Sequence, residues 1–253
     1  GSLRTLTKNR DEAFRLLGLA MTQPRFDDEP VERIRGQIIA GLVRSAQDPN
    51  RIAGKTFFEA AFPGHPYGHT TRGEEETVAA VTADDLRAFV KSRLAKDTML
   101  IGAVGDITSE ELGRLLDSAL GPLPAAAQAF EIPEIAFPED NRTIVIRRGN
   151  PQSVLMFGMP GIKRNDPNYF AAVLLNHVLG GGSFSSRLYH EIREKRGLAY
   201  SVYSNIQPMA QGGLVSGGVG TDNTKVIESL DLIREEWRRM AEDGVSKDEL
   251  KDS

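Results

Sequence analysis

The imidazole side chains are the groups of this chain best suited to hold a metal ion. The chain has four of them: His65, His69, His177 and His190. A zinc hydrolase site uses two or three neutral imidazoles with a carboxylate, and two of the ligands usually lie on one helix. His65 and His69 are four residues apart, but Pro66 and Gly68 stand between them. We therefore expect both in a loop, with packing or turn roles, because proline and glycine break the helix that this spacing would need.

The other two histidines have no second histidine at metal-binding spacing. His177 precedes Val178 in an apolar stretch, which is typical of a packed helix residue, and His190 is followed by Glu191 alone. Neither H-E-x-x-H nor H-x-x-E-H occurs in the chain. No lysine follows the three glycines at 180–182, which argues against a phosphate loop, and no G-x-S-x-G elbow for a serine nucleophile is present. We expect no metal ligand and no catalytic residue here.

A second pair of residues suits the binding of a polar ligand. Arg193 and Tyr200 are seven residues apart, with Gly197 between them where the chain can turn back. A guanidinium keeps its charge and offers several directed donors to a carbonyl or carboxylate. A phenol donates to an oxygen that gains negative charge. The residues alone leave a second interpretation open, in which Arg193 belongs to a solvated charge run and Tyr200 to a strand core.

Composition narrows the class of protein. The 253 residues include 31 Lys and Arg against 35 Asp and Glu, a formal net charge of -4, which argues against a nucleic-acid partner. No apolar run approaches the roughly 18 residues of a membrane span. The chain has no Cys, which excludes disulfides, thiolate zinc sites and a cysteine nucleophile. A hydrophobic fraction of 40% is that of a globular protein.

Helical and strand patterns alternate along the chain, which predicts an α+β fold. We expect helices at 10–21, 28–47, 51–61, 82–94, 108–120, 168–179, 185–196 and 224–243. We expect strands at 98–104, 143–147, 153–159, 200–206 and 213–219. Capping boxes at Thr108 with Glu111 and at Ser246 with Glu249 mark two helix starts, and Asn50 is expected to cap another.

Four prolines between residues 122 and 141 are typical of a linker. We therefore divide the chain into residues 1–121, a proline-rich linker at 122–141, and residues 142–253. A helix, a break and a newly capped helix occur near Asp28 and again near Ser246, which favours two related units.

Residues 180–203, GGGSFSSRLYHEIREKRGLAYSVY, resemble the signature of the second half of pitrilysin/insulinase-type zinc peptidases, whose relatives include mitochondrial processing peptidase. The segments at 62–68 (FPGHPYG) and 104–106 (VGD) resemble parts of the first half of that family. The resemblance covers essentially the whole chain. It implies an α+β fold of two homologous α/β halves of the metallohydrolase type seen in mitochondrial processing peptidase. Both halves are expected to be incomplete here, residues 1–121 lacking the metal helix and residues 142–253 beginning the inactive half.

The family's zinc site is expected to be absent. By resemblance, H-x-x-E-H lies upstream of residue 1, and a distant glutamate ligand falls near Ile39 to Gly41. No carboxylate occurs between Glu32 and Asp48. The resemblance also implies that Arg193 and Tyr200 bind substrate, because the family's inactive half uses an arginine and a tyrosine seven apart.

These expectations describe a non-catalytic, substrate-binding subunit or domain of a peptide-degrading or processing metalloprotease. It would bind no cofactor itself and would act on unfolded peptides with a sister subunit that carries H-x-x-E-H and zinc, or as a homodimer. One alternative is an active zinc metalloendopeptidase truncated upstream, and another is a structural core-type subunit. The resemblance favours a bacterial, periplasmic protein over a cytoplasmic one.

Overall fold

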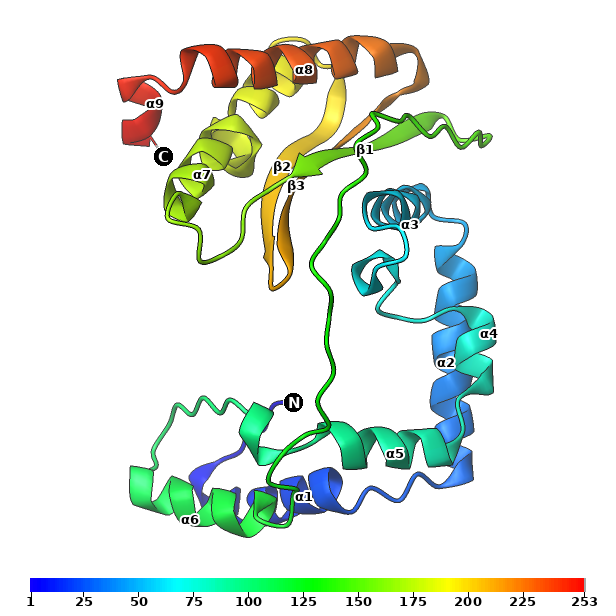
Figure 1. Cartoon of the computed structure of the whole chain (residues 1–253), viewed down its shortest axis with the longest axis vertical. Helices are drawn as coiled ribbons and strands as arrows, with labels where there is room; N and C mark the ends of the chain where they lie inside the picture. Colours follow the sequence, from blue (N-terminus) through cyan, green and yellow to red (C-terminus); the bar gives the residue numbers. More distant parts are fainter. Residues whose placement is uncertain (253) are drawn as a thin grey trace. The chain divides into compact units, whose positions relative to one another are not determined.

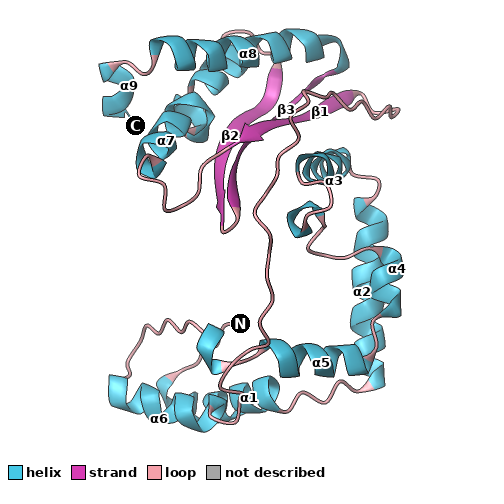
Figure 2. Ribbon diagram, viewed as in Figure 1, coloured by secondary structure: helices cyan, strands magenta, loops and turns pink. Residues whose placement is uncertain are grey.

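The computed structural model describes residues 1–252 and has an α+β fold, as the sequence predicts (Figures 1 and 2). The chain forms two compact units, each built from two separate segments. The first unit contains Gly1–Leu42 and Arg72–Glu131, and the second contains Val43–Thr71 and the chain from Ile132 onward. The division at residues 122–141 stays a prediction.

The first unit is helical (Figure 2). Its helices are α1 (Arg10–Thr22), most of α2 (Asp28–Ser45), α4 (Glu75–Ala80), α5 (Ala83–Arg93) and α6 (Ser109–Leu120). α1 and α6 pack closely, because Gly18 lies against the Ala119 backbone, where a side chain at position 18 would come within 3.0 Å of the Ala119 oxygen. The predicted capping box of Thr108 and Glu111 begins α6.

The second unit contains an antiparallel sheet with the strand order β1-β3-β2 (Figure 1). Its elements are α3 (Pro49–Ala61), β1 (Gln152–Pro160), α7 (Tyr169–Asn176), β2 (Ala199–Met209), β3 (Gly212–Asp222), α8 (Val226–Asp243) and α9 (Lys247–Asp252). Val202 and Val219 of the sheet are buried in one apolar cluster with Ile233 and Met240 of α8. α3 packs on β1, since Gly158 meets the Phe57 ring.

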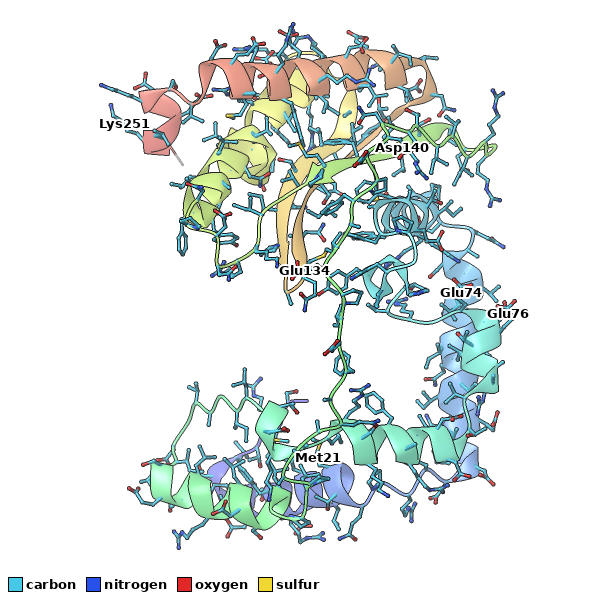
Figure 3. The ribbon with its side chains drawn as sticks, in the orientation of Figure 1. Met21, Glu74, Glu76, Glu134, Asp140 and Lys251 are labelled. Carbon is cyan, nitrogen blue, oxygen red and sulfur yellow. The ribbon has the colours of Figure 1, made fainter. Side chains whose placement is uncertain are left out.

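The proline-rich segment crosses into the second unit as an extended chain. The Ile135 N–H donates to the Gln211 carbonyl at 3.0 Å. Glu134, labelled in Figure 3, pairs with Lys163 at 2.7 Å. The segment is therefore held by specific contacts with the β2–β3 hairpin and the loop after β1.

Two predicted strands, 98–104 and 143–147, are wrong. Lys96–Thr98 forms a short 3-10 turn, and residues 99–104 and 143–147 are irregular. Leu100 and Val145 are 100% and 74% exposed, and these segments belong to no sheet within residues 1–252. An apolar, β-branched run forms a strand only when a neighbouring strand pairs with it.

The helix boundaries differ from prediction in two respects. Asp48, rather than Asn50, caps α3, because its Oδ1 accepts from the Asn50 N–H at 2.9 Å. The helices expected at 168–179 and 185–196 both contain π-helical turns, η4 (His177–Gly181) and η6 (Tyr189–Glu194). A π-turn adds one residue to a helical turn, and the hydrophobic period does not reveal it.

The Arg187–Glu249 ion pair links the turn before η6 to α9. Arg187 Nε lies 2.5 Å from Glu249 Oε1, and the guanidinium also donates to the Gly244 carbonyl at 2.8 Å. The side chains of Arg187 and Glu249 are 14% and 31% exposed. The hydrogen bond from Arg187 lowers the pKa of Glu249 to about 2, against an ordinary value of 4.5.

We predict that Glu249→Gln lowers the free energy of unfolding by about 1 kcal/mol at neutral pH, a modest amount because solvent reaches the pair. Because the folded-state pKa is depressed, this stabilisation is complete above pH 4.5 and is lost as the pH falls through about 2. Urea unfolding of both proteins across this range is the measurement. Glu242→Gln, at an exposed position, serves as the control and should change little. If the difference in free energy of unfolding between the two proteins stays constant down to low pH, the depressed pKa of Glu249 is contradicted.

Candidate functional site

Three buried side chains hold the segment that carries Arg193 and Tyr200. Leu188 and Ile192 are 0% exposed and Leu198 is 6% exposed, and all three belong to the core of the second unit. Since Ile192 and Leu198 point inward, the residues between them form an external turn. Arg193 lies on this turn and is exposed.

Gly197 closes the turn. Its φ of 58° lies in the left-handed region, which glycine adopts without strain. The Gly197 N–H donates to the Arg193 carbonyl at 3.0 Å, and the Leu198 N–H donates to the Ile192 carbonyl at 2.9 Å. The prediction that the chain doubles back at Gly197, between Arg193 and Tyr200, is thus confirmed.

A β-bulge places Tyr200 on the surface. Ala199 pairs with Thr221 and Ser201 pairs with Gly220, so Tyr200 is the extra residue of β2. Ala199 and Val202 are both buried although they are three residues apart, which is possible because the bulge inserts one outward residue. Tyr200 is 69% exposed, so it is not a strand core residue.

The acidic side chains near Arg193 form ion pairs or hydrogen bonds with residues other than Arg193. Glu191 accepts from Lys195 at 2.6 Å and from Arg196 at 2.7 Å, and these bonds lower its pKa to about 2. Glu194 is bonded to His190 at 2.6 Å. Both acidic side chains, Glu191 and Glu194, are therefore engaged by side chains other than Arg193.

The Arg193 side chain contacts an aromatic ring. Its guanidinium carbon lies 4.9 Å from the centroid of the Tyr189 ring, and no carboxylate pairs with it in this part of the chain. No hydrogen bond joins its side chain to Tyr200 among the described residues. Two exposed donors, one cationic and one phenolic, thus stand at the two ends of one short turn, available to a carbonyl or carboxylate from outside.

His65 has a structural role, as the loop prediction states. Its Nδ1 accepts from the Tyr67 N–H at 3.1 Å, and its Nε2 lies 2.9 Å from the Pro133 carbonyl, to which it donates. Both ring nitrogens are occupied, so His65 offers no lone pair to a metal. His69 follows it in an exposed part of the same loop. Residues 1–252 contain no group of three His, Asp or Glu side chains positioned to hold a metal ion. The donor set therefore does not fit the zinc site of a peptidase.

Two aromatic residues beside Arg193 were not singled out from the sequence. Tyr189 is four residues before Arg193 and contacts it, and Phe184 meets the Tyr189 ring edge-on, with centroids 4.9 Å apart. The four-residue spacing of Tyr189 and Arg193 could have predicted their contact, because side chains four residues apart lie on one side of a helix.

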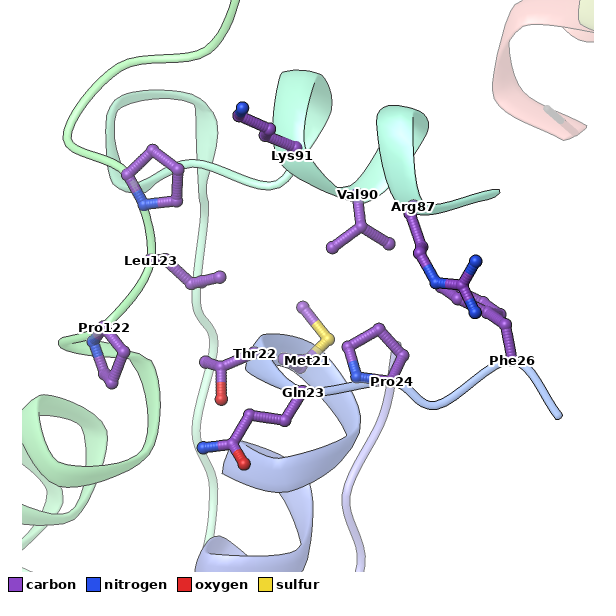
Figure 4. Close-up of a pocket in the computed structure, with 11 residues that line it drawn as sticks. Met21, Thr22, Gln23, Pro24, Phe26, Arg87, Val90, Lys91, Pro122 and Leu123 are labelled. Carbon is purple, nitrogen blue, oxygen red and sulfur yellow. The ribbon is translucent and has the colours of Figure 1, made fainter. Parts of the chain in front are cut away.

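A separate cavity of about 300 Å³ lies in the first unit (Figure 4). Its lining includes Phe26, Leu123 and Lys91, from the α1–α2 connection, the segment after α6, and α5. Phe26 has a φ of 53°, unusual for a residue other than glycine. The cavity contains neither Arg193 nor Tyr200 and no carboxylate in its lining.

Known proteins resemble this chain along nearly its whole length. The family model described as "Peptidase M16 inactive domain" matches residues 80–253. An uncharacterized zinc protease of Streptomyces coelicolor is 32% identical over 241 residues, which are 91% of this chain and 51% of that protein. A non-peptidase homolog from Helicobacter pylori is 28% identical over 255 residues, which are 100% of this chain and 58% of that protein.

A solved structure agrees with these matches. The crystal structure of a peptidase M16 inactive domain from Pseudomonas fluorescens superposes with a TM-score of 0.87 at 28% identity, covering 97% of this chain and 60% of that one. The chain thus spans between about half and 60% of the length of these relatives. The family match runs without a break through residues 122–141, so it favours one inactive domain over two halves.

We predict that the chain binds no zinc in a stoichiometric site, because both ring nitrogens of His65 are engaged and the described residues place no three His, Asp or Glu side chains around a common point. The measurement is metal analysis after dialysis against micromolar zinc. One tightly held zinc per chain that is lost in His65→Ala or His69→Ala would overturn this prediction.

Proposed function

The chain belongs to the peptidase M16 family and matches its inactive domain, and on this premise we propose that it is a non-catalytic subunit or domain that binds peptides for a zinc-bearing partner. One observation carries the proposal. Among the residues that the structure describes, Arg193 has no carboxylate partner while the neighbouring acids are paired, and Tyr200 is turned outward by a bulge. Such an arrangement is suited to an external acceptor.

The substrate class we propose is an unfolded peptide held in an extended conformation. The carbonyls and carboxylates of a peptide are the acceptors that a guanidinium and a phenol recognise. The sheet order β1-β3-β2 leaves one side of β1 and one side of β2 without a neighbouring strand in the described sheet. An extended peptide can add to such an edge through main-chain hydrogen bonds, which supports this choice of substrate.

The zinc in this proposal belongs to a sister subunit that carries H-x-x-E-H, or to another part of a longer protein. The engaged nitrogens of His65 and the carboxylate-free stretch from 33 to 47 support it. In the alternative of a homodimer of this chain, no sister subunit would carry H-x-x-E-H. Within residues 1–252 no helix has the length and apolarity to cross a bilayer. The periplasmic location stays a prediction.

A structural core-type subunit is the second candidate, because the Helicobacter pylori relative is named a non-peptidase homolog. A structural subunit would use Tyr200 and Arg193 as contact surface, whereas a bound peptide supplies acceptors for the donors of both side chains. We therefore favour the peptide-binding role over it. An active zinc endopeptidase would require a metal site formed by residues outside this chain.

We predict that the isolated chain does not hydrolyse peptides. Its sequence has no H-E-x-x-H or H-x-x-E-H motif to hold a metal that activates water, no Cys and no G-x-S-x-G serine elbow. The measurement is incubation of the purified chain with an unstructured peptide, with and without chelator. Cleavage that chelator abolishes, after contaminants are excluded, would show that the chain is itself a peptidase.

In the assembly with a zinc-bearing partner, Tyr200→Phe should lower kcat/KM by roughly 30- to 1000-fold, about 2–4 kcal/mol, since one donor to the reacting carbonyl is lost. Arg193→Ala should also weaken peptide binding, because it removes a charged anchor. Neither change should lower the melting temperature, since both side chains are exposed.

Lys195→Ala is the matched control, because Lys195 belongs to the same charge run but is paired with Glu191. It should leave kcat/KM within a few-fold of the parent protein. Unchanged activity in both Tyr200→Phe and Arg193→Ala would reject the peptide-binding role and favour the structural subunit.

A further inference from the structure

An aromatic pair lies directly beside Arg193. The Arg193 guanidinium carbon is 4.9 Å from the centroid of the Tyr189 ring. Phe184 contacts the same ring edge-on, with a centroid distance of 4.9 Å and an interplanar angle of 74°. Phe184 belongs to the 3-10 turn η5 (Ser183–Ser185), and Tyr189 and Arg193 belong to η6. Phe184 of η5 thus contacts Tyr189 of η6, and Tyr189 in turn contacts the Arg193 guanidinium.

The turn that carries Phe184 is firmly anchored. Ser186 is 0% exposed, and its hydroxyl donates to the Ser183 carbonyl at 2.8 Å. The Ser185 hydroxyl donates to the Gly182 carbonyl at 3.0 Å. Ser183 has a φ of 50°, a left-handed conformation that is unfavourable for a residue with a side chain and that the surrounding contacts must impose. The backbone that carries Phe184 is therefore held by local contacts, and the Phe184 ring, which is 73% exposed, meets the Tyr189 ring edge-on.

Contact with a ring holds an arginine differently from an ion pair. The ring attracts the flat face of the guanidinium, whereas the N–H donors lie in the guanidinium plane and remain free for an acceptor. A carboxylate in the same place would occupy those donors. Both nearby candidates are engaged elsewhere, Glu191 with Lys195 and Arg196, and Glu194 with His190.

We propose that Tyr189, supported by Phe184, is a positioning residue that holds the Arg193 guanidinium in place for a peptide acceptor while leaving its donors free. The proposal rests on the peptide-binding role of Arg193. A long arginine side chain loses rotamer freedom when it binds a ligand, and a ring that already restricts it reduces this loss. Tyr189 itself need not touch the peptide.

The geometry can be tested without any peptide. In nuclear magnetic resonance spectra of the labelled chain, the Arg193 side-chain protons should be shifted upfield by the Tyr189 ring current. Tyr189→Phe keeps the ring and should keep the shift, and Tyr189→Leu should abolish it. An Arg193 shift that is unchanged in Tyr189→Leu would overturn the proposal.

The effect on binding is measured by the affinity of a fluorescently labelled unstructured peptide for the same variants. Tyr189→Leu should weaken binding by roughly 2- to 30-fold, the range expected for a lost cation–π contact. Tyr189→Phe should bind like the parent chain. In an Arg193→Ala background, Tyr189→Leu should have no further effect, because a positioning residue acts only through the residue it positions.

Phe130→Leu is the matched control, because Arg93 lies 4.2 Å from the centroid of the exposed Phe130 ring in the first unit. It removes a contact of the same kind and should leave peptide affinity unchanged. If Arg193→Ala does not weaken binding, the peptide-binding role fails. If Arg193→Ala weakens binding but Tyr189→Leu does not, or if the two effects add, that role stands and the positioning role of Tyr189 is rejected.

Discussion

The burial of Ile192 and Leu198 is the constraint on which the rest of the site depends. Their side chains enter one apolar core and the Leu198 N–H bonds to the Ile192 carbonyl, so the residues between them must form an external turn. Gly197 permits the turn, and the bulge at Tyr200 restores the inward direction at Val202. The exposure of Arg193 and Tyr200 is thus a consequence of how the core is packed. Both side chains are therefore accessible to solvent at the two ends of the turn.

The distribution of charge explains why Arg193 differs from the cations around it. Lys195 and Arg196 share Glu191, and Glu194 is bonded to His190, so the local acids are already engaged. Exposed ion pairs of this kind stabilise a fold only slightly. In this turn they also leave the Arg193 donors without a bond to either Glu191 or Glu194. Among the cations at 193–196, Arg193 is therefore the one that has no carboxylate partner within residues 1–252.

Local signals predicted much of this fold and of its candidate site. The helix caps at Thr108 and Ser246 and the seven-residue spacing of Arg193 and Tyr200 depend on neighbours in the chain, and the sequence contains them directly. The features that the sequence did not predict depend on distant segments or on single inserted residues. Residues 98–104 and 143–147 have the composition of strands, but pairing is a property of two segments. The π-helical turn of η6 and the bulge at Tyr200 each add one residue to a regular pattern, and the hydrophobic period does not reveal such an addition.

Mapping of a bound peptide on the chain tests the central claim most directly. The backbone amide signals of the labelled chain would be followed by nuclear magnetic resonance as an unstructured peptide is added. The account predicts that the largest shift changes fall between residues 189 and 201, and that they disappear in Arg193→Ala while the melting temperature is unchanged. Peptide-induced changes that avoid this turn, or that persist undiminished in Arg193→Ala, would contradict the claim that Arg193 and Tyr200 form a peptide-binding site.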